Sequence, residues 1–409
     1  MPSMPLIQPA QRASGFGESV IRETTRLARR YGATNLAQGL PDLPAPQRLK
    51  DLAKAAIDAD HNQYAFTWGL KELRDAIARK HAHFYNQAYD PETEVVVCCG
   101  SSEAIVSAML AFVAPGDEVI IFEPIYENYI PATKLCSAVP VFVSLRQDAG
   151  SHGAWVFDEA ELRAAFSNKT RAIILNTPNN PTGKVFGLDE LGVIAALCQQ
   201  YNVLCLTDEI YEHMVYDGVR HIPMATLDGM ADRTLTITGF SKTFCVTGWR
   251  TGYAVGCPAL INPVRKVHDY ATIAAPTPQQ VALARFLDET LDDPSFYTTM
   301  VAGYDTRRKR LTGILRQAGF TFADPAGAYY VFADYRHVMP DTHAFDATIE
   351  LITQAGVATV PGSSFYRTTD AVGCPDTDRY LRFCFPKTEA TLAEAEAKLL
   401  QWRKPGEPN

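Results

Sequence analysis

The chain places a lysine and an arginine in one short loop where they could capture a carbonyl and a phosphate. Lys242 follows Ser241 after a predicted strand at 234–238, and Arg250 comes two residues after Gly248. A desolvated lysine amine attacks carbonyl carbons, and a guanidinium is a permanent cation whose donors match phosphate oxygens. Pyridoxal phosphate carries both groups. Either residue alone could instead belong to the solvated surface.

A carboxylate and a tyrosine follow a second predicted strand. The apolar run 203–207 predicts a buried strand, which Asp208 ends, and Tyr211 comes three residues later. Ligands of open α/β sheets bind beyond the carboxyl ends of the strands. Asp208 could keep a pyridine nitrogen protonated, which makes the ring an electron sink, and Tyr211 could reach its phenolic oxygen. The alternative role of Asp208 is a helix N-cap.

A glycine turn with hydroxyl residues follows a third predicted strand, 95–99. Gly100 precedes Ser101, Ser102 and Glu103, which begin a predicted helix. The free amides and the dipole of a helix N-terminus bind anions, so this turn could hold a phosphate. The same residues could also serve only as a helix cap.

A proline-rich turn, 177–183, follows the predicted strand 171–176 and carries Asn180. Together these motifs resemble the class I/II aminotransferases, the fold-type I enzymes that use pyridoxal 5'-phosphate, over about residues 14–400. The resemblance implies that Lys242, Asp208 and Tyr211 are catalytic. It assigns to the cofactor the residues Tyr64, Ser101, Ser102, Glu103, Tyr126, Asn180, Asp208, Tyr211, Ser241, Lys242 and Arg250.

The resemblance also implies where the substrate carboxylate binds. Arg382 alternates with Leu381 and Phe383 in a predicted strand, and the family uses an arginine here to grip the α-carboxylate with a fork of donors. Asn180 and Gly39 complete the implied substrate site. A solvent-facing arginine on an edge strand is the alternative for Arg382.

Three tyrosines have implied positions. Tyr126 corresponds to the aromatic residue that stacks on the pyridine ring, and we expect Tyr129 to pack in the core. Tyr64 lies in a segment, 62–69, that in the family crosses to the partner subunit and touches its cofactor phosphate. The resemblance therefore implies a homodimer, although Tyr64 could equally be a core tyrosine of one subunit.

The implied activity is transfer of an amino group from an L-amino acid to a 2-oxo acid. No second arginine stands close to Tyr64 or Tyr126, which favours neutral, aromatic or sulfur-containing substrates unless Arg22 points inward. The alternatives are β- or γ-elimination or replacement, as in a carbon–sulfur lyase or an aminocyclopropane-carboxylate-synthase-like enzyme. A regulator without turnover would need a DNA-binding domain, and the resemblance begins too early to leave room for one.

Composition limits the other function classes. The 409 residues are 47% hydrophobic and 21% charged with a net charge of -8, which argues against a nucleic-acid surface. There is no apolar stretch long enough to span a membrane and no signal-peptide pattern, so we expect a cytoplasmic protein with no membrane partner. The nine cysteines and nine histidines lack metal-ligand spacing, and we expect no metal site.

Alternating predicted strands and helices between about 49 and 287 indicate an α/β fold with a mostly parallel sheet covered on both faces. We expect a large cofactor-binding domain over 49–293 and a smaller α+β domain formed by 1–48 and 294–409. The periodicity predicts helices at 70–84, 102–114, 188–201, 278–291 and 301–317. It predicts later strands at 328–332, 357–361 and 380–385.

Overall fold

An eight-stranded mixed sheet forms the centre of the protein in a computed structural model that describes residues 7–8, 10–14, 17–148, 153–293, 295–367 and 377–402. Five strands, β8, β7, β6, β3 and β4, run parallel as neighbours, whereas β9 and β5 are antiparallel to theirs. The order across the sheet is β2 (Val95–Cys98), β9 (Gly252–Val255), β8 (Thr234–Gly239), β7 (Leu204–Asp208), β6 (Thr170–Asn176), β3 (Glu118–Glu123), β4 (Val139–Gln147) and β5 (Trp155–Phe157).

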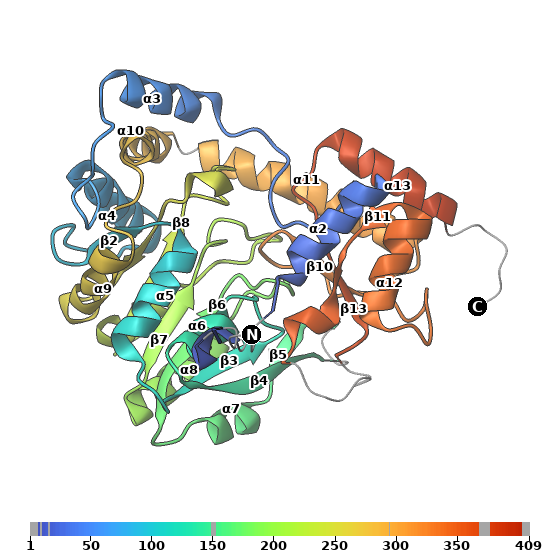
Figure 1. Ribbon diagram of the computed structural model, residues 1–409, viewed down its shortest axis with the longest axis horizontal. Helices are drawn as coiled ribbons and strands as arrows, with labels where there is room; N and C mark the ends of the chain where they lie inside the picture. Colours follow the sequence, from blue (N-terminus) through green and yellow to red (C-terminus); the bar gives the residue numbers. More distant parts are fainter. Residues whose placement is uncertain are drawn as a thin grey trace, which may run out of the picture.

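Helices cover both faces of this sheet, which explains why its strands read as continuous apolar runs. In β2, Val96 and Cys98 face a cluster that includes residues of α5, while Val95 and Val97 face a cluster with residues of α4. Figure 1 shows this lobe on the left. Its helices are α3 (Gln47–Asp58), α4 (Lys71–Tyr85), α5 (Ser101–Phe112), α6 (Tyr129–Leu135), α7 (Glu159–Ala165), α8 (Leu188–Tyr201), α9 (Pro258–Ala271) and α10 (Thr277–Asp292).

A smaller lobe, on the right in Figure 1, combines an N-terminal segment that includes α2 with the C-terminal part of the described chain. Its antiparallel sheet has the order β10 (Tyr330–Asp334), β13 (Tyr380–Cys384) and β12 (Val360–Pro361), and β1 (Thr34–Asn35) pairs with β11 (Val357–Ala358). The associated helices are α2 (Val20–Tyr31), the long α11 (Ser295–Gln317), α12 (Ala344–Glu350) and α13 (Glu389–Trp402), whereas the short α1 (Gln11–Ser14) lies against α6 of the large lobe.

The α/β class and the four helices predicted before residue 292 are confirmed to within two residues at each end. Three later predictions were wrong in extent. The segment 357–361 forms two strands in different sheets rather than one. Strand β10 begins at Tyr330, because Ala328 adopts a left-handed backbone with φ of 55°. Helix α11 starts at Ser295, six residues before the predicted start, because the preceding sequence shows no clear apolar period.

The two lobes share a hydrophobic core. One cluster joins Phe122 and Phe186 of the large lobe to Phe332 and Tyr380 of the small one. Two others lie within the large sheet and its helices. From these last two clusters, whose buried residues all lie between 49 and 287, we propose the domain division at 48/49 and 293/294. In the described part of the chain, no helix combines the length and apolarity needed to cross a bilayer, and the eight cysteines there are free thiols, with Cys374 outside it.

Candidate active site

Asp208 lies at the carboxyl end of β7 and forms no ion pair with any other described residue. Its Oδ2 accepts a hydrogen bond from the hydroxyl of Tyr129 at 2.7 Å, and its Oδ1 accepts the Ile210 N–H at 3.3 Å. Burial raises the pKa of Asp208 to about 6 against these hydrogen bonds. A turn rather than a helix follows Asp208, so the N-cap alternative was wrong. Tyr129 packs in the core as expected, and its hydroxyl has the additional role of binding Asp208.

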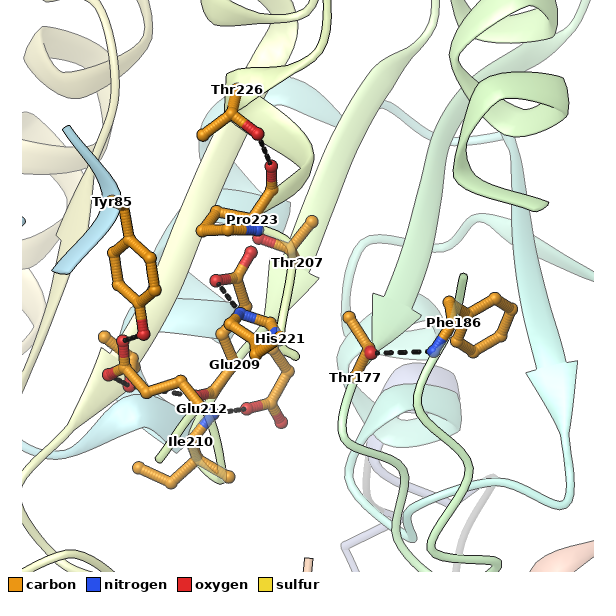
Figure 2. Close-up of polar contacts among 12 residues, drawn as sticks. Tyr85, Thr177, Phe186, Thr207, Glu209, Ile210, Glu212, His221, Pro223 and Thr226 are labelled. Carbon is orange, nitrogen blue, oxygen red and sulfur yellow. Dashed lines mark hydrogen bonds and ion pairs between the residues drawn. The ribbon is translucent and has the colours of Figure 1, made fainter. Parts of the chain in front are cut away.

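The turn after β7 has a second side that faces buried protein (Figure 2). Glu209 contacts Nε2 of His221 at 2.7 Å, and Glu212 accepts hydrogen bonds from Lys80, Tyr85 and Thr238. Burial alone would raise the pKa of Glu212, but the charge of Lys80 holds it below its ordinary value. Asp208 and Tyr211 thus face the site, while two anchored glutamates fix their turn from behind.

Asn180 lies in the predicted turn, which Asn176 ties to the same strand end. The side chain of Asn176 accepts the Asn180 N–H at 2.7 Å and donates to the Asp208 carbonyl at 2.9 Å. The Oδ1 of Asn180 in turn accepts a hydrogen bond from Nη1 of Arg382 at 2.8 Å. Asn176 therefore couples the proline-rich turn to the carboxylate, and the sequence reasoning assigned it no role.

Arg382 is 1% exposed on the central strand of its sheet, so the solvent-facing edge alternative was wrong. Its guanidinium lies between the rings of Tyr330 and Phe365, at 4.3 and 4.8 Å from their centroids. Nη2 donates to the Ala37 carbonyl at 3.0 Å, and Nε, although buried, has no partner among the described residues. This buried fork retains donors for a carboxylate.

Lys242 approaches the same place from the loop after β8. Its Nζ donates to the carbonyl of Gly39 at 3.1 Å and lies 5.6 Å from the Tyr329 ring centroid. It forms no ion pair within the described part of the chain. Burial, assisted by the positive charge of Arg382, lowers the pKa of Lys242 to about 8. Such an amine is a stronger nucleophile near neutral pH than a surface lysine. Ser241 next to it is also buried.

Arg250 lies at the N-terminus of α5, the helix that begins at Ser101 and continues through Ser102 and Glu103. Its guanidinium donates to the carbonyls of Thr247 and Cys99. It lies so close to Gly100 that a Cβ built there would be 2.5 Å from Nη2. Gly100 also has φ of 86°, which other residues avoid. The helix amides and the cation therefore converge, as an anion site requires.

The Glu103 side chain binds protein groups rather than the open end of this turn. Its carboxylate accepts the Cys99 N–H at 3.0 Å and contacts Nδ1 of His268 at 3.0 Å. Burial would lower the pKa of His268, but the Glu103 carboxylate raises it. His268 Nε2 meets the Thr67 carbonyl at 2.9 Å. Any contact of Glu103 with a bound anion would therefore come from its backbone N–H.

Tyr126 lies beside this turn and Tyr64 does not pack in the core. Asn128 donates to Ser102 Oγ at 3.1 Å and to the Tyr126 hydroxyl at 3.3 Å, and so joins the hydroxyl turn to the aromatic ring. Tyr64 is 82% exposed, which contradicts the core alternative. The structure thus brings together the predicted residues other than Tyr64.

The contacts missed from the sequence involve Tyr129, Asn128, Asn176, Tyr329 and Tyr330. Tyr329 donates to the Gly39 carbonyl at 2.7 Å, and the hydroxyl of Tyr330 lies 2.9 Å from that of Tyr211. The only sequence signal for Tyr329 and Tyr330 was their position in the predicted strand 328–332.

Comparison with known proteins identifies the class to which this site belongs. The family model for aminotransferase class I and II matches residues 32–399, so the chain belongs to this family. It is 36% identical to human kynurenine–oxoglutarate transaminase 1, over 96% of this chain and 98% of that one. It is 38% identical to a probable N-succinyldiaminopimelate aminotransferase of Mycobacterium tuberculosis, over 95% of this chain and 97% of the relative.

Solved structures agree with this assignment. The structure of the Mycobacterium tuberculosis N-succinyldiaminopimelate aminotransferase matches with a TM-score of 0.90 at 38% identity, covering 96% of this chain and 99% of that one. The Escherichia coli protein YbdL, with a methionine aminotransferase function, matches with a TM-score of 0.90 at 30% identity, covering 97% and 100%. The chain is an aminotransferase, and enzymes of its family depend on pyridoxal phosphate.

The residues present fit that cofactor. The buried carboxylate of Asp208 has no cationic partner among the described residues, and a protonated pyridine nitrogen would supply one. Lys242 offers an amine without a carboxylate partner, and the turn at Gly100 presents helix amides beside Arg250 for a phosphate.

We predict that the Lys242 amine of the cofactor-free protein titrates near pH 8. Burial disfavours the charged form, so the amine loses its proton at lower pH than an exposed lysine. Competitive labelling with trace acetic anhydride, followed by peptide mass analysis across pH, measures this value. Lys71 is the internal control, because it is exposed and its hydrogen bond with Asp75 raises its pKa, so it should titrate at higher pH than Lys242. A Lys242 midpoint equal to that of Lys71 would contradict the prediction.

Lys80→Met should strongly destabilise the protein, because it leaves the buried Glu212 carboxylate without its cation. Removal of one member of a buried ion pair costs about 3–5 kcal/mol. The urea midpoint of unfolding, followed by circular dichroism, should fall accordingly. The matched variant on the same helix is Lys71→Met, whose ion pair is exposed, and it should leave the midpoint unchanged. Equal midpoints for the two variants would refute the proposed importance of the buried pair.

Proposed function

We propose that the protein binds pyridoxal 5'-phosphate through Lys242 and uses it to transfer amino groups from L-amino acids to 2-oxo acids. The observation that carries this proposal is the convergence of Lys242, Asp208 and Arg382 where both lobes meet, since none of the three forms an ion pair with another described residue. When bound, the cofactor supplies an aldehyde for the amino group and an electron sink for the substrate's Cα.

The residues of the proposed cofactor site then each have a defined role. The N-terminal amides of α5 and the Arg250 guanidinium bind the phosphate, and Tyr126 packs against the ring. Asp208, oriented by Tyr129, holds a proton on the pyridine nitrogen. Tyr211 donates a hydrogen bond to the phenolic oxygen, an oxygen that Asn180 also binds.

Substrate binding and proton transfer follow from the remaining contacts. Arg382, with its unpartnered Nε, binds the α-carboxylate together with Asn180 and the backbone of Gly39. With a substrate in place, the free Lys242 amine would be positioned to take the Cα proton and to return a proton, and the cofactor would supply the electron sink for this transfer. A depressed pKa suits this exchange, because the amine can accept and release a proton near neutral pH.

The proposed substrates are neutral, aromatic or sulfur-containing amino acids. The kynurenine transaminase and the methionine aminotransferase among the similar proteins support this class. Arg22, the cation that could have offered a second carboxylate site, is exposed on α2. We propose a cytoplasmic enzyme with no nucleic-acid, membrane or metal partner.

We also propose a homodimer in which Tyr64 reaches the partner subunit's cofactor phosphate. Four exposed apolar side chains support it, namely Tyr64, Phe66, Tyr270 and Ile273. Contacts from Thr277 to the Gln63 carbonyl and from His268 to the Thr67 carbonyl join their two segments. Sedimentation velocity should give twice the mass of the chain.

A single-turnover experiment tests the proposed function. The protein is loaded with pyridoxal phosphate and mixed with single amino acids in the absence of an oxo acid. Transamination gives one equivalent of oxo acid and of pyridoxamine phosphate per site, and then stops. Continued release of ammonia with pyruvate or 2-oxobutyrate would instead indicate elimination and overturn the proposal.

Arg382→Lys should weaken amino acid and oxo acid together, because lysine cannot reproduce the fork that holds their shared carboxylate. We expect KM to rise on the order of 10- to 100-fold for both substrates, or about 1.4–2.7 kcal/mol. The absorption spectrum of the bound cofactor should remain. Arg379→Lys is the control. Arg379 directly precedes β13 and forms an ion pair with Asp334 at the end of β10. Unchanged substrate affinity with weaker cofactor binding would reject this role.

A further inference from the structure

The hydroxyl of Tyr330 occupies a position between the proposed cofactor and substrate contacts. Tyr330 is the first residue of β10, and it is 2% exposed. Its hydroxyl lies 2.9 Å from the hydroxyl of Tyr211. It also lies against Gly39, where an added Cβ would be only 2.2 Å from the Tyr330 oxygen. No role for Tyr330 follows from the sequence motifs.

The strand pairing fixes the ring of Tyr330. Tyr330 is paired with Cys384 and Phe332 with Arg382, so the Arg382 side chain reaches the Tyr330 ring along the diagonal of one sheet face. The guanidinium carbon lies 4.3 Å from the ring centroid. The hydroxyl at the tip of this ring is therefore held in one place by Arg382, by Gly39 and by Tyr211.

Either hydroxyl could be the donor, and the proposed role of Tyr211 toward the cofactor sets the direction of the hydrogen bond. Burial raises the pKa of Tyr211 and of Tyr330, so both hydroxyls keep their protons at neutral pH. Only one of the two protons can lie between the two oxygens. If Tyr211 donated it, Tyr211 would have none left for the cofactor. Tyr329, the neighbouring phenol, is already committed to the Gly39 carbonyl at 2.7 Å.

We infer that Tyr330 is a positioning residue that donates its hydroxyl proton to the Tyr211 oxygen and thereby directs the Tyr211 proton to the phenolic oxygen of the cofactor. This inference rests on the proposed binding of pyridoxal phosphate. The inference adds Tyr330, a residue of the small lobe, to the residues that act on the phenolic oxygen of the cofactor ring. The titratable and charged groups that face the Tyr330 hydroxyl are Tyr126, Tyr211, Tyr329, Arg382 and Cys384.

The test is a pH titration of the visible absorption of the bound cofactor in four proteins: wild type, Tyr330→Phe, Tyr211→Phe and the double variant. A donor to the phenolic oxygen competes with the proton that this oxygen shares with the Lys242 nitrogen. When the donor is weakened, the proton shared with the Lys242 nitrogen remains bound up to a higher pH. Tyr330→Phe should raise the midpoint by roughly 0.4–1 pH unit, the size of one neutral hydrogen bond.

Because Tyr330 acts through Tyr211, its removal should have no further effect once Tyr211 is phenylalanine. The double variant should therefore titrate like Tyr211→Phe. The control is Tyr335→Phe, which removes a buried hydroxyl bonded to the Thr342 carbonyl at 2.7 Å. It should lower the melting temperature and leave the midpoint in place, so a purely structural effect is recognised.

Gly39→Ala provides a second variant in which Tyr330 itself is intact. The new methyl group would overlap the Tyr330 hydroxyl and must displace it from its present hydrogen-bond geometry with Tyr211, so the midpoint should rise, and by less in the Tyr330→Phe background. An unchanged midpoint in Tyr330→Phe, or a shift that persists in the Tyr211→Phe background, would overturn the inference. Absence of any protein-bound absorption in wild type would instead be a failure of the proposed function.

Discussion

One buried guanidinium joins the three chain segments on which the site depends. Arg382 of β13 contacts Asn180 in the turn after β6 and the Ala37 carbonyl near the start of the described chain. These residues are separated by 202 and 345 positions along the sequence. A guanidinium this deeply buried is costly unless its donors are satisfied, and Nε has no partner in the described residues. The substrate carboxylate proposed for this place would satisfy it.

The two ionisable groups near Arg382 can gain or lose a proton close to neutral pH. Lys242 and Asp208 have pKa values of about 8 and 6, displaced toward neutrality by burial. The glutamates behind them are instead paired, Glu212 with Lys80 and Glu209 with His221. The turn after β7 therefore has a fixed side and a reactive side, and the fixed side supplies the rigidity that a preorganised site requires.

Sequence motifs located the groups that carry charge, but they did not identify the groups that orient them. Lys242, Asp208 and Arg382 stand in loops or strands with a local signature. Tyr129, Asn176 and Tyr330 act through contacts between distant segments, and an aromatic or amide residue in an apolar run has no distinct pattern. The same reason explains the split of 357–361 into two strands, since sheet partners are set by tertiary packing.

The central claim is that Lys242, among all lysines of the chain, captures the cofactor aldehyde. Its most direct test is borohydride reduction of the protein loaded with pyridoxal phosphate, followed by tryptic peptide mapping. We predict one reduced adduct, on the peptide containing Lys242, and none in Lys242→Ala. An adduct of equal yield on another lysine, or one that persists in the Lys242→Ala variant, would contradict it.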